Sequence, residues 1–196
     1  MFYKTTTLTV ITPRNCEAWL QHMSQHSTTT LWTWFSGSSR LAATMAATPF
    51  LQPVLPPIDL RYGWNVNDSR HQRLLNLLDD TFKPFFTTYE PRCRAWSVAG
   101  VSRGHDKTQR LRQEEHHMLT YTATRIQHNI DTQRHALVES PKSSSIFTDS
   151  PLKTVLAKTT WHETAMCQFS PEPDGERSLK MTGLQCSMQL QRCIKQ

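Results

Sequence analysis

A long stretch almost free of charge is the feature that most constrains how this chain can fold. Between Ala18 and Ile58 the only strongly acidic or basic side chain is Arg40, whereas charged residues crowd into the segment from Asp59 to Glu139. An uncharged stretch either enters a core, crosses a membrane or stays polar and irregular. The charge pattern therefore divides the chain into parts with different expected structure.

Prolines exclude a membrane-spanning helix within this stretch. Leu41 to Ile58 is free of charge, but it contains Pro49, Pro53, Pro56 and Pro57. Each proline removes a backbone donor and interrupts an α-helix, while a span in lipid must satisfy its own backbone. We expect an extended connector here, and no membrane span.

The composition permits one modest hydrophobic core. Of the 196 residues, 37% are hydrophobic, which is below the share of typical globular domains. Six tryptophans and eight phenylalanines still supply large apolar surfaces, so a fully disordered chain is not expected. Scarce glycine beside plentiful threonine, glutamine and histidine is typical of an orphan or viral accessory protein, and we expect that character here.

We predict an α+β fold that is rich in helix and has an irregular N-terminal arm. The alternative is a mostly α-helical, partly disordered chain. The predicted parts are an uncharged arm and connector rich in Ser, Thr and Pro (1–58), a charged core region (59–139), a linker (140–150) and C-terminal amphipathic helices (151–196).

The clearest predicted helix begins at Asp68 or Ser69, either of which can cap it, and ends before Pro84. Its apolar residues recur at the spacing of one helical face and are Leu74, Leu75, Leu78 and Phe82. We expect this face to pack on a core.

The N-terminal arm contains two further candidates. Pro13 to His26 can form a short helix, with Trp19, Leu20 and Met23 on one side. The aromatic patch from Leu31 to Phe35 is expected to dock on the core as a strand or turn.

The middle of the chain leaves two interpretations open. Ala95 to Val101 is typical of a short strand, and Asp106 can cap a helix that runs to about His117. Leu119 to Thr124 alternates apolar residues with threonine, which predicts a half-buried strand. A single long helix through Leu137 is the alternative.

The C-terminal part is predicted to be helical. Ser150 and Pro151 together favour the start of a helix. Met181 to Ile194 places Cys186 and Cys193 on one helical face with two aliphatic residues.

A basic segment is the candidate binding site. Within 21 residues that contain a single acid, Asp106, the chain carries six strong bases, namely Arg92, Arg94, Arg103, Lys107, Arg110 and Arg112. Clustered cations bind the phosphates of RNA or DNA, and the neighbouring Trp96 and Tyr89 could stack on bases. A solvated helix face would give the same pattern, and that alternative stays open.

The sequence lacks the motifs of catalysis and of tight metal binding. Gly100 to Thr108 superficially resembles a phosphate-binding loop, but no glycine directly precedes Lys107. The group Cys16, His22 and His26 has no fourth metal ligand in view. We therefore predict no enzymatic activity, no cofactor, no metal and no small-molecule substrate. A reactive thiol at Cys93, next to two arginines, is the one catalytic class left open.

We therefore expect a non-enzymatic accessory or interaction protein with a protein partner, which uses the basic segment to contact RNA, DNA or another anionic partner. The alternative is a structural subunit of a larger assembly. Five cysteines without a CxxC motif and without a secretory signal indicate an intracellular location, cytoplasmic or nuclear. The Ser/Thr-rich start only partly resembles an organellar transit peptide, because it carries few positive charges.

Overall fold

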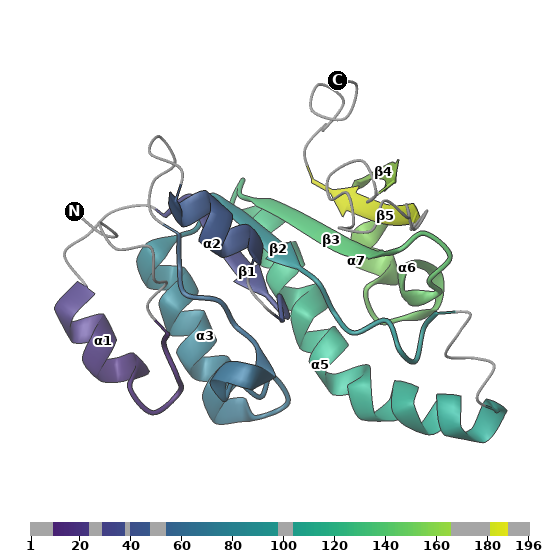
Figure 1. Cartoon of the computed structure of the whole chain (residues 1–196), viewed down its shortest axis with the longest axis horizontal. Coiled ribbons are helices and arrows are strands. Elements are labelled where there is room, and N and C mark those ends of the chain that lie inside the picture. The colour runs from purple at the N-terminus through teal and green to yellow at the C-terminus, as the bar shows by residue number, and fades with distance from the viewer. Residues whose placement is uncertain are drawn as a thin grey trace, which may run out of the picture. The chain divides into compact units, whose positions relative to one another are not determined.

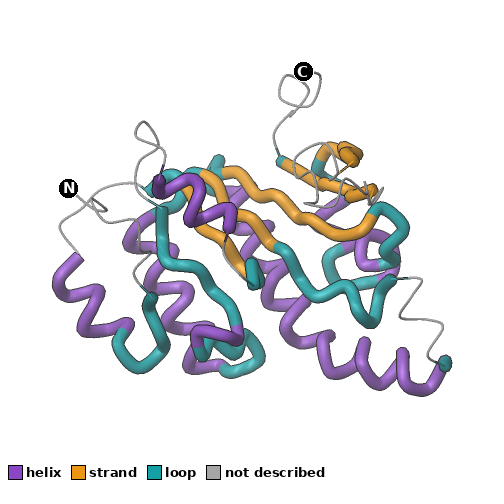
Figure 2. The backbone as a smooth tube through the Cα atoms, in the orientation of Figure 1, coloured by secondary structure: helices purple, strands orange, loops and turns teal. Residues whose placement is uncertain are grey.

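The computed structural model describes residues 10–23, 29–37, 40–47, 54–97, 104–165 and 181–187. The chain divides into two compact units, Met1–Glu90 and Pro91–Gln196. Each unit contains both helices and strands (Figures 1 and 2), which confirms the predicted helix-rich α+β class. The boundary at Glu90 falls inside the predicted charged core region, so these units differ from the parts expected from sequence.

The first unit is built on parallel strands. Its elements are the helices α1 (Cys16–Met23), α2 (Arg40–Ala47) and α3 (Ser69–Phe82), the short 3-10 helix η1 (Leu60–Tyr62), and the strands β1 (Leu31–Trp34) and β2 (Phe86–Tyr89). β2 runs parallel to β1. Residues 54–58 run parallel along the other edge of β1, where the Leu55 amide donates to the Leu31 carbonyl over 2.8 Å. β1 is therefore the middle strand of the three.

All four residues of β1 are buried, which explains why this part of the sequence avoids charge. A parallel strand covered on both faces is apolar along its whole length instead of alternating. The indole nitrogen of Trp32 donates to the Pro56 carbonyl over 3.0 Å, and Trp34 packs edge-on against Tyr89. The expected docking of the aromatic patch is confirmed.

The connector predicted for Leu41 to Ile58 is not extended throughout. Its first part forms α2, in which Ala42 is fully buried against Leu31 and Val54. The alanine-rich sequence has high helix propensity, and Pro49 lies beyond the end of the helix. Extension is confirmed only for residues 54–58, which join β1 instead of linking two parts.

The helix predicted after Asp68 is confirmed as α3. The Asp68 carboxylate accepts from the backbone amide of Arg70 over 2.7 Å, and this hydrogen bond lowers the pKa of Asp68. The predicted apolar face is buried, and Phe82 at its end contacts Trp19 of α1. Lys83 ends the helix in the left-handed conformation, directly before Pro84.

The second unit consists of helices and antiparallel strands. They are α5 (His105–Asp131), β3 (His135–Pro141), α6 (Ile146–Asp149), α7 (Lys153–Leu156), β4 (Thr160–Ala165) and β5 (Met181–Cys186). β5 pairs antiparallel with β3 on one edge and with β4 on the other. α5 packs against β3 and α7.

Residues 119–124 belong to α5, so the predicted strand is wrong and the alternative of one long helix is right as far as Asp131. The buried residues Leu119, Thr122 and Ile126 recur every three or four positions, as a helix requires. Thr122 donates its hydroxyl hydrogen to the Met118 carbonyl one turn earlier, over 2.9 Å. This local bond lets a threonine sit inside a buried helix without an unpaired hydroxyl.

The predicted linker and C-terminal helices take other forms. Within residues 140–150, Ser140 ends up in β3, while Ile146 and Phe147 are buried in α6. Residues 153–156 are helical, but Thr160 already begins β4. Residues 181–186 form β5 because the backbone pairs on both edges, and tertiary pairing overrides a helical spacing of apolar residues. The rest of the predicted last helix lies outside the described residues.

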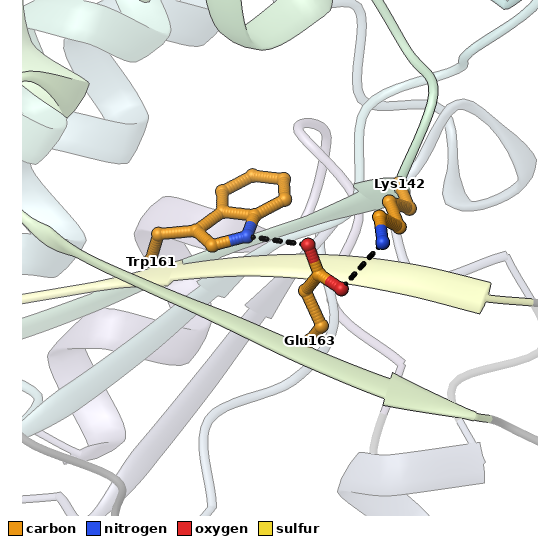
Figure 3. Close-up of polar contacts among 3 residues, drawn as sticks. All are labelled: Lys142, Trp161 and Glu163. Atoms are coloured by element: carbon orange, nitrogen blue, oxygen red, sulfur yellow. Dashed lines mark hydrogen bonds and ion pairs between the residues drawn. The ribbon is translucent and has the colours of Figure 1, made fainter.

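Trp161 lies across the glycine of the neighbouring strand. A Cβ placed on Gly183 would collide with the Trp161 ring. The Trp161 indole nitrogen donates to Glu163 over 3.0 Å, and Glu163 pairs with Lys142 over 2.6 Å (Figure 3). Two hydrogen bonds lower the pKa of Glu163; the one from Lys142 has the larger effect and the one from Trp161 the smaller. Phe147 meets the same indole edge-on.

We expect Gly183→Ala to destabilise the protein by about 1–3 kcal/mol, because the new methyl group overpacks against the indole. In a Trp161→Val background the same substitution should stabilise by about 0.5 kcal/mol, since alanine restricts the unfolded chain more than glycine does. Urea unfolding of the four proteins measures both effects. Equal effects of Gly183→Ala in the two backgrounds would contradict the assigned contact.

Candidate nucleic-acid interface

The structure describes five of the six bases of the predicted site, all in the second unit. Arg92 and Arg94 lie in the segment before α5, and three more bases lie in the first turns of that helix, namely Lys107, Arg110 and Arg112. Arg103 lies outside the described residues.

The segment 91–97 is fastened to α5 through Trp96. Its indole nitrogen donates to the Glu115 carboxylate over 2.8 Å, and its backbone carbonyl accepts from the Ser145 amide over 2.7 Å. The strand predicted from Ala95 is absent from residues 95–97, where the Trp96 and Ser97 amides instead close a turn on the Cys93 carbonyl. Residues 98–101 of that prediction lie outside the described part.

Arg112 also joins segment 91–97 to α5. Its guanidinium lies 4.7 Å from the centre of the Trp96 ring and donates to the Ala95 carbonyl over 3.0 Å and to the Ser145 hydroxyl over 2.9 Å. These contacts use two of the five N–H donors of Arg112 inside the fold and stack its guanidinium on Trp96. Arg112 is therefore mainly a structural residue.

The aromatic residues of the predicted site are not available for stacking. Trp96 is 3% exposed and Tyr89 is 1% exposed, so neither ring presents a face to a ligand. The indole of Trp96 stabilises the fold instead, and the stacking part of the sequence-based hypothesis is wrong.

The charges that act on Glu115 indicate that Arg92 and Arg94 lie near α5. Burial raises the pKa of this carboxyl, and the hydrogen bond from Trp96 and the positive charges of Arg92 and Arg94 only partly offset the effect. Both arginines are exposed at the surface yet close enough to act on a side chain of α5. Cations from two separate segments thus gather around one half of the helix.

Four of the five described bases remain at the surface, namely Arg92, Arg94, Lys107 and Arg110. Arg110 lies 3.7 Å from Glu114, with 72% of its side chain exposed. An exposed pair of this kind contributes little and is readily exchanged for another anion. We call these four residues the basic rim.

The second unit also contains an open depression of about 800 Å³, which none of the four rim residues lines. One wall is a face of α5, formed by Gln109, Arg112, Gln113, His116 and His117. The rest of the lining comes from Trp96, Asp149, Ser150 and Pro151. The sequence analysis missed this groove, although the spacing of its α5 residues, at i, i+3, i+4, i+7 and i+8, is that of one helical face.

The first unit contains a second polar feature, at the carboxyl end of β1. The Asp59 carboxylate accepts from the Gly37 amide over 3.0 Å and from the Arg61 amide over 2.9 Å. Gly37 has a φ of 54°, in the left-handed region that glycine favours. The sequence analysis missed this contact. Its signal in the sequence is a Gly after the apolar run of β1 and an Asp directly after the apolar run at residues 54–58.

Among the cysteines that the structure describes, Cys16 is unsuited to act as a nucleophile. Cys16 is fully buried, and burial together with the charge of Glu17 raises its pKa to about 11, so its thiolate form is suppressed. Of the group Cys16, His22 and His26, for which the sequence predicts no metal, His26 and the side chain of His22 lie outside the described part. Cys93 is a partly buried free thiol between Arg92 and Arg94.

None of the helices in the described part of the chain combines the length and the apolar character that crossing a membrane requires.

Comparison with known proteins gives a likeness of fold alone. No family model matches the sequence, and neither does any curated protein. The chain is similar in structure to a methyltransferase of Entamoeba histolytica, EhMeth, with a TM-score of 0.52 and 9% sequence identity. The match covers 84% of this chain and 54% of that one, so the chain spans about half the length of EhMeth.

Glu115 generates a prediction about pH. Because its pKa is raised in the fold, the protonated form is favoured there, and this contribution is lost as pH rises through the folded pKa. Glu115→Gln stays neutral and keeps an acceptor for Trp96. We expect the thermal stability of the variant to gain on that of the wild type as the pH rises from about 3 to 7.

The control is Glu114→Gln, on the exposed side of the same helix. Melting curves at both pH values should show no comparable gain for this variant. An identical difference between Glu115→Gln and the wild type at the two pH values would contradict the assignment.

Proposed function

We propose that this protein is a non-enzymatic accessory or interaction protein that binds nucleic acid, RNA or DNA, through the basic rim. The observation that carries the proposal is the convergence of exposed cations from two segments on one half of α5. Arg92 and Arg94 reach it from the preceding segment, and Lys107 and Arg110 come from the helix itself.

The anchoring of segment 91–97 supports a binding surface that exists before the partner arrives. Trp96, Glu115 and Arg112 fix the backbone that carries the two preceding arginines. Cations held in place lose less conformational freedom on binding than those of a flexible tail. The net charge of +6 also favours association with a polyanion.

The thiols support an intracellular site of action. Within the described part of the chain, Cys16 and Cys93 are free thiols, as in a reducing compartment. A protein partner remains part of the proposal, and the composition of the chain is its support.

We expect Lys107→Ala with Arg110→Ala to weaken binding of a nucleic acid by a similar factor for all sequences. Binding by the variant neutralises fewer phosphates and therefore releases fewer counterions. The slope of log K against log salt should become shallower by about 1.5. Fluorescence anisotropy at several salt concentrations measures the slope. The matched control is Arg70→Ala with Arg73→Ala. It removes from α3 two exposed bases that are three residues apart, as Lys107 and Arg110 are.

An unchanged salt slope in the rim variant, or an equal change in the control, would reject the basic rim as the contact surface. Salt-insensitive association with a protein complex, without nucleic acid, would instead favour a structural subunit of a larger assembly.

A second candidate function, binding of a ribose-containing ligand, is favoured by the contact between Asp59 and Gly37. In open parallel sheets, ligands bind outside the carboxyl ends of the strands where the strand order reverses. The chain runs from β1 through α2 to residues 54–58 on one side, and then through α3 to β2 on the other. Asp59 and Gly37 lie at that end of β1.

Asp59 has the chemistry for a ribose. In dinucleotide-binding folds, an acid about 20 residues after the glycine loop accepts from the ribose hydroxyl groups. Asp59 follows Gly37 at a comparable spacing, and two amide hydrogen bonds leave further lone pairs on its carboxylate.

Calorimetry with adenosine and with 2′,3′-dideoxyadenosine tests this candidate. We expect adenosine to bind at least about tenfold more tightly, since the partly buried Asp59 carboxylate loses its hydrogen-bond partner in the dideoxy compound. Asp59→Asn should remove most of the difference. Equal binding of the two nucleosides, or binding of neither, would reject a ribose site at Asp59.

A further inference from the structure

We infer that binding of nucleic acid by the basic rim is linked to protonation of Glu115, so that the affinity rises as the pH falls. This inference rests on the proposed nucleic-acid function and concerns its regulation. Glu115 lies on α5 at the point where the segment with Arg92 and Arg94 is anchored to the helix.

The backbone keeps the two arginines close to the Glu115 carboxyl group. The indole nitrogen of Trp96 donates to that group over 2.8 Å, and Arg94 precedes Trp96 by two residues. The chain also turns back here, because the Trp96 amide donates to the Cys93 carbonyl over 3.0 Å. The arginine side chains are exposed, so a phosphate can reach them without disturbing these contacts.

Opposing influences act on the proton affinity of Glu115. Burial is the largest and raises the pKa of this carboxyl, and the charge of Glu114 acts in the same direction. The hydrogen bond from Trp96 and the positive charges of Arg92 and Arg94 oppose the rise. The two arginines therefore set part of the proton affinity of Glu115.

Three other side chains contact Trp96 or belong to its segment, and the test has to allow for them. Arg112, stacked on the Trp96 ring, keeps its positive charge at every pH used. Ser145, whose hydroxyl donates to the Trp96 carbonyl, is uncharged. Cys93 is a thiol that Glu115→Gln leaves in place, so its contribution cancels between wild type and variant, as does that of the histidines.

Phosphates bound by Arg92 and Arg94 would favour the protonated form of Glu115. They offset the two positive charges that promote ionisation, and they bring a negative charge of their own near the carboxylate. Nucleic acid therefore binds more tightly when Glu115 is neutral, and by reciprocity its binding promotes uptake of a proton. The tighter binding is lost as the pH rises through the pKa of this carboxyl, which burial places above its ordinary value.

The affinity of the full chain for a mixed-sequence RNA twelve-mer at about pH 4.5 and pH 7 tests the inference, with the ionic strength held constant. Glu115→Gln stays neutral at both pH values and keeps an acceptor for Trp96. We expect it to bind about fivefold more tightly than the wild type at the higher pH, as removal of one nearby unit charge would give. At the lower pH the two proteins should differ by less than about twofold, because wild-type Glu115 is then mostly protonated.

The control is Asp131→Asn, which makes the same change of charge at the exposed last residue of α5. This residue lies about 24 Å from Glu115 along the helix axis, so its charge is screened from the segment with the two arginines. We expect it to change the RNA affinity by less than about twofold at either pH. Circular dichroism at both pH values checks that every variant is folded.

Two further measurements connect the effect to the arginines. In an Arg92→Ala, Arg94→Ala background, Glu115→Gln should change the RNA affinity at the higher pH by less than about twofold, because phosphates are no longer held there. Calorimetry in buffers of different ionisation enthalpy, at the midpoint of the wild-type affinity change, counts the protons taken up on binding. The wild type should take up about 0.4 proton more than Glu115→Gln, which is the uptake that a fivefold coupling allows. A purely structural role of Glu115 would not change this proton count.

A Glu115→Gln effect of equal size at both pH values, an equal proton uptake in the two proteins, or an effect that persists without Arg92 and Arg94 would overturn the link. The basic rim would stand in each of these cases, provided that RNA binding by the wild type depends on salt. Failure of the wild type to bind RNA at any pH, or binding that does not depend on salt, would instead reject the proposed function itself, and the inference with it.

Discussion

Buried strands must hydrogen-bond their backbones on both edges, and each unit of this protein is organised around one strand that does so. In the first unit, β1 pairs with β2 and with residues 54–58. In the second, β5 pairs with β3 and β4. An unpaired buried amide or carbonyl costs as much as a lost hydrogen bond, so these pairings decide where the remaining elements lie.

The same constraint explains which elements could be predicted from sequence. α3 was predictable because its signals are local: a capping Asp68, four apolar residues on one face and Pro84 beyond its end. β5 was not predictable, because the apolar residues from Met181 to Cys186 recur at a spacing that also suits a helix. Only the partners on β3 and β4, more than fifteen residues away in the chain, decide in favour of a strand.

The candidate site shows a similar division between local and distant information. Sequence alone identified the cluster of bases, since charge is visible in the residue types. It could not separate Arg110, which faces solvent beside Glu114, from Arg112, which donates to Ala95 and Ser145. Those two residues are two positions apart on α5 and therefore point in different directions. The role of each follows from what packs beside the helix.

The difference between these arginines also bears on how the site keeps its shape. A guanidinium stacked on Trp96 and bonded to a carbonyl and a hydroxyl is pre-organised, and so is the chain segment that it holds. The neighbouring Glu115 is partly desolvated for the same reason, and this burial raises its pKa. The contacts that hold segment 91–97 on α5 therefore oppose ionisation of Glu115, whereas the Arg92 and Arg94 side chains stay in solvent. A surface with rigid backbone and exposed cations can select a partner by the geometry of its charges and of its bases, which a flexible basic tail cannot do.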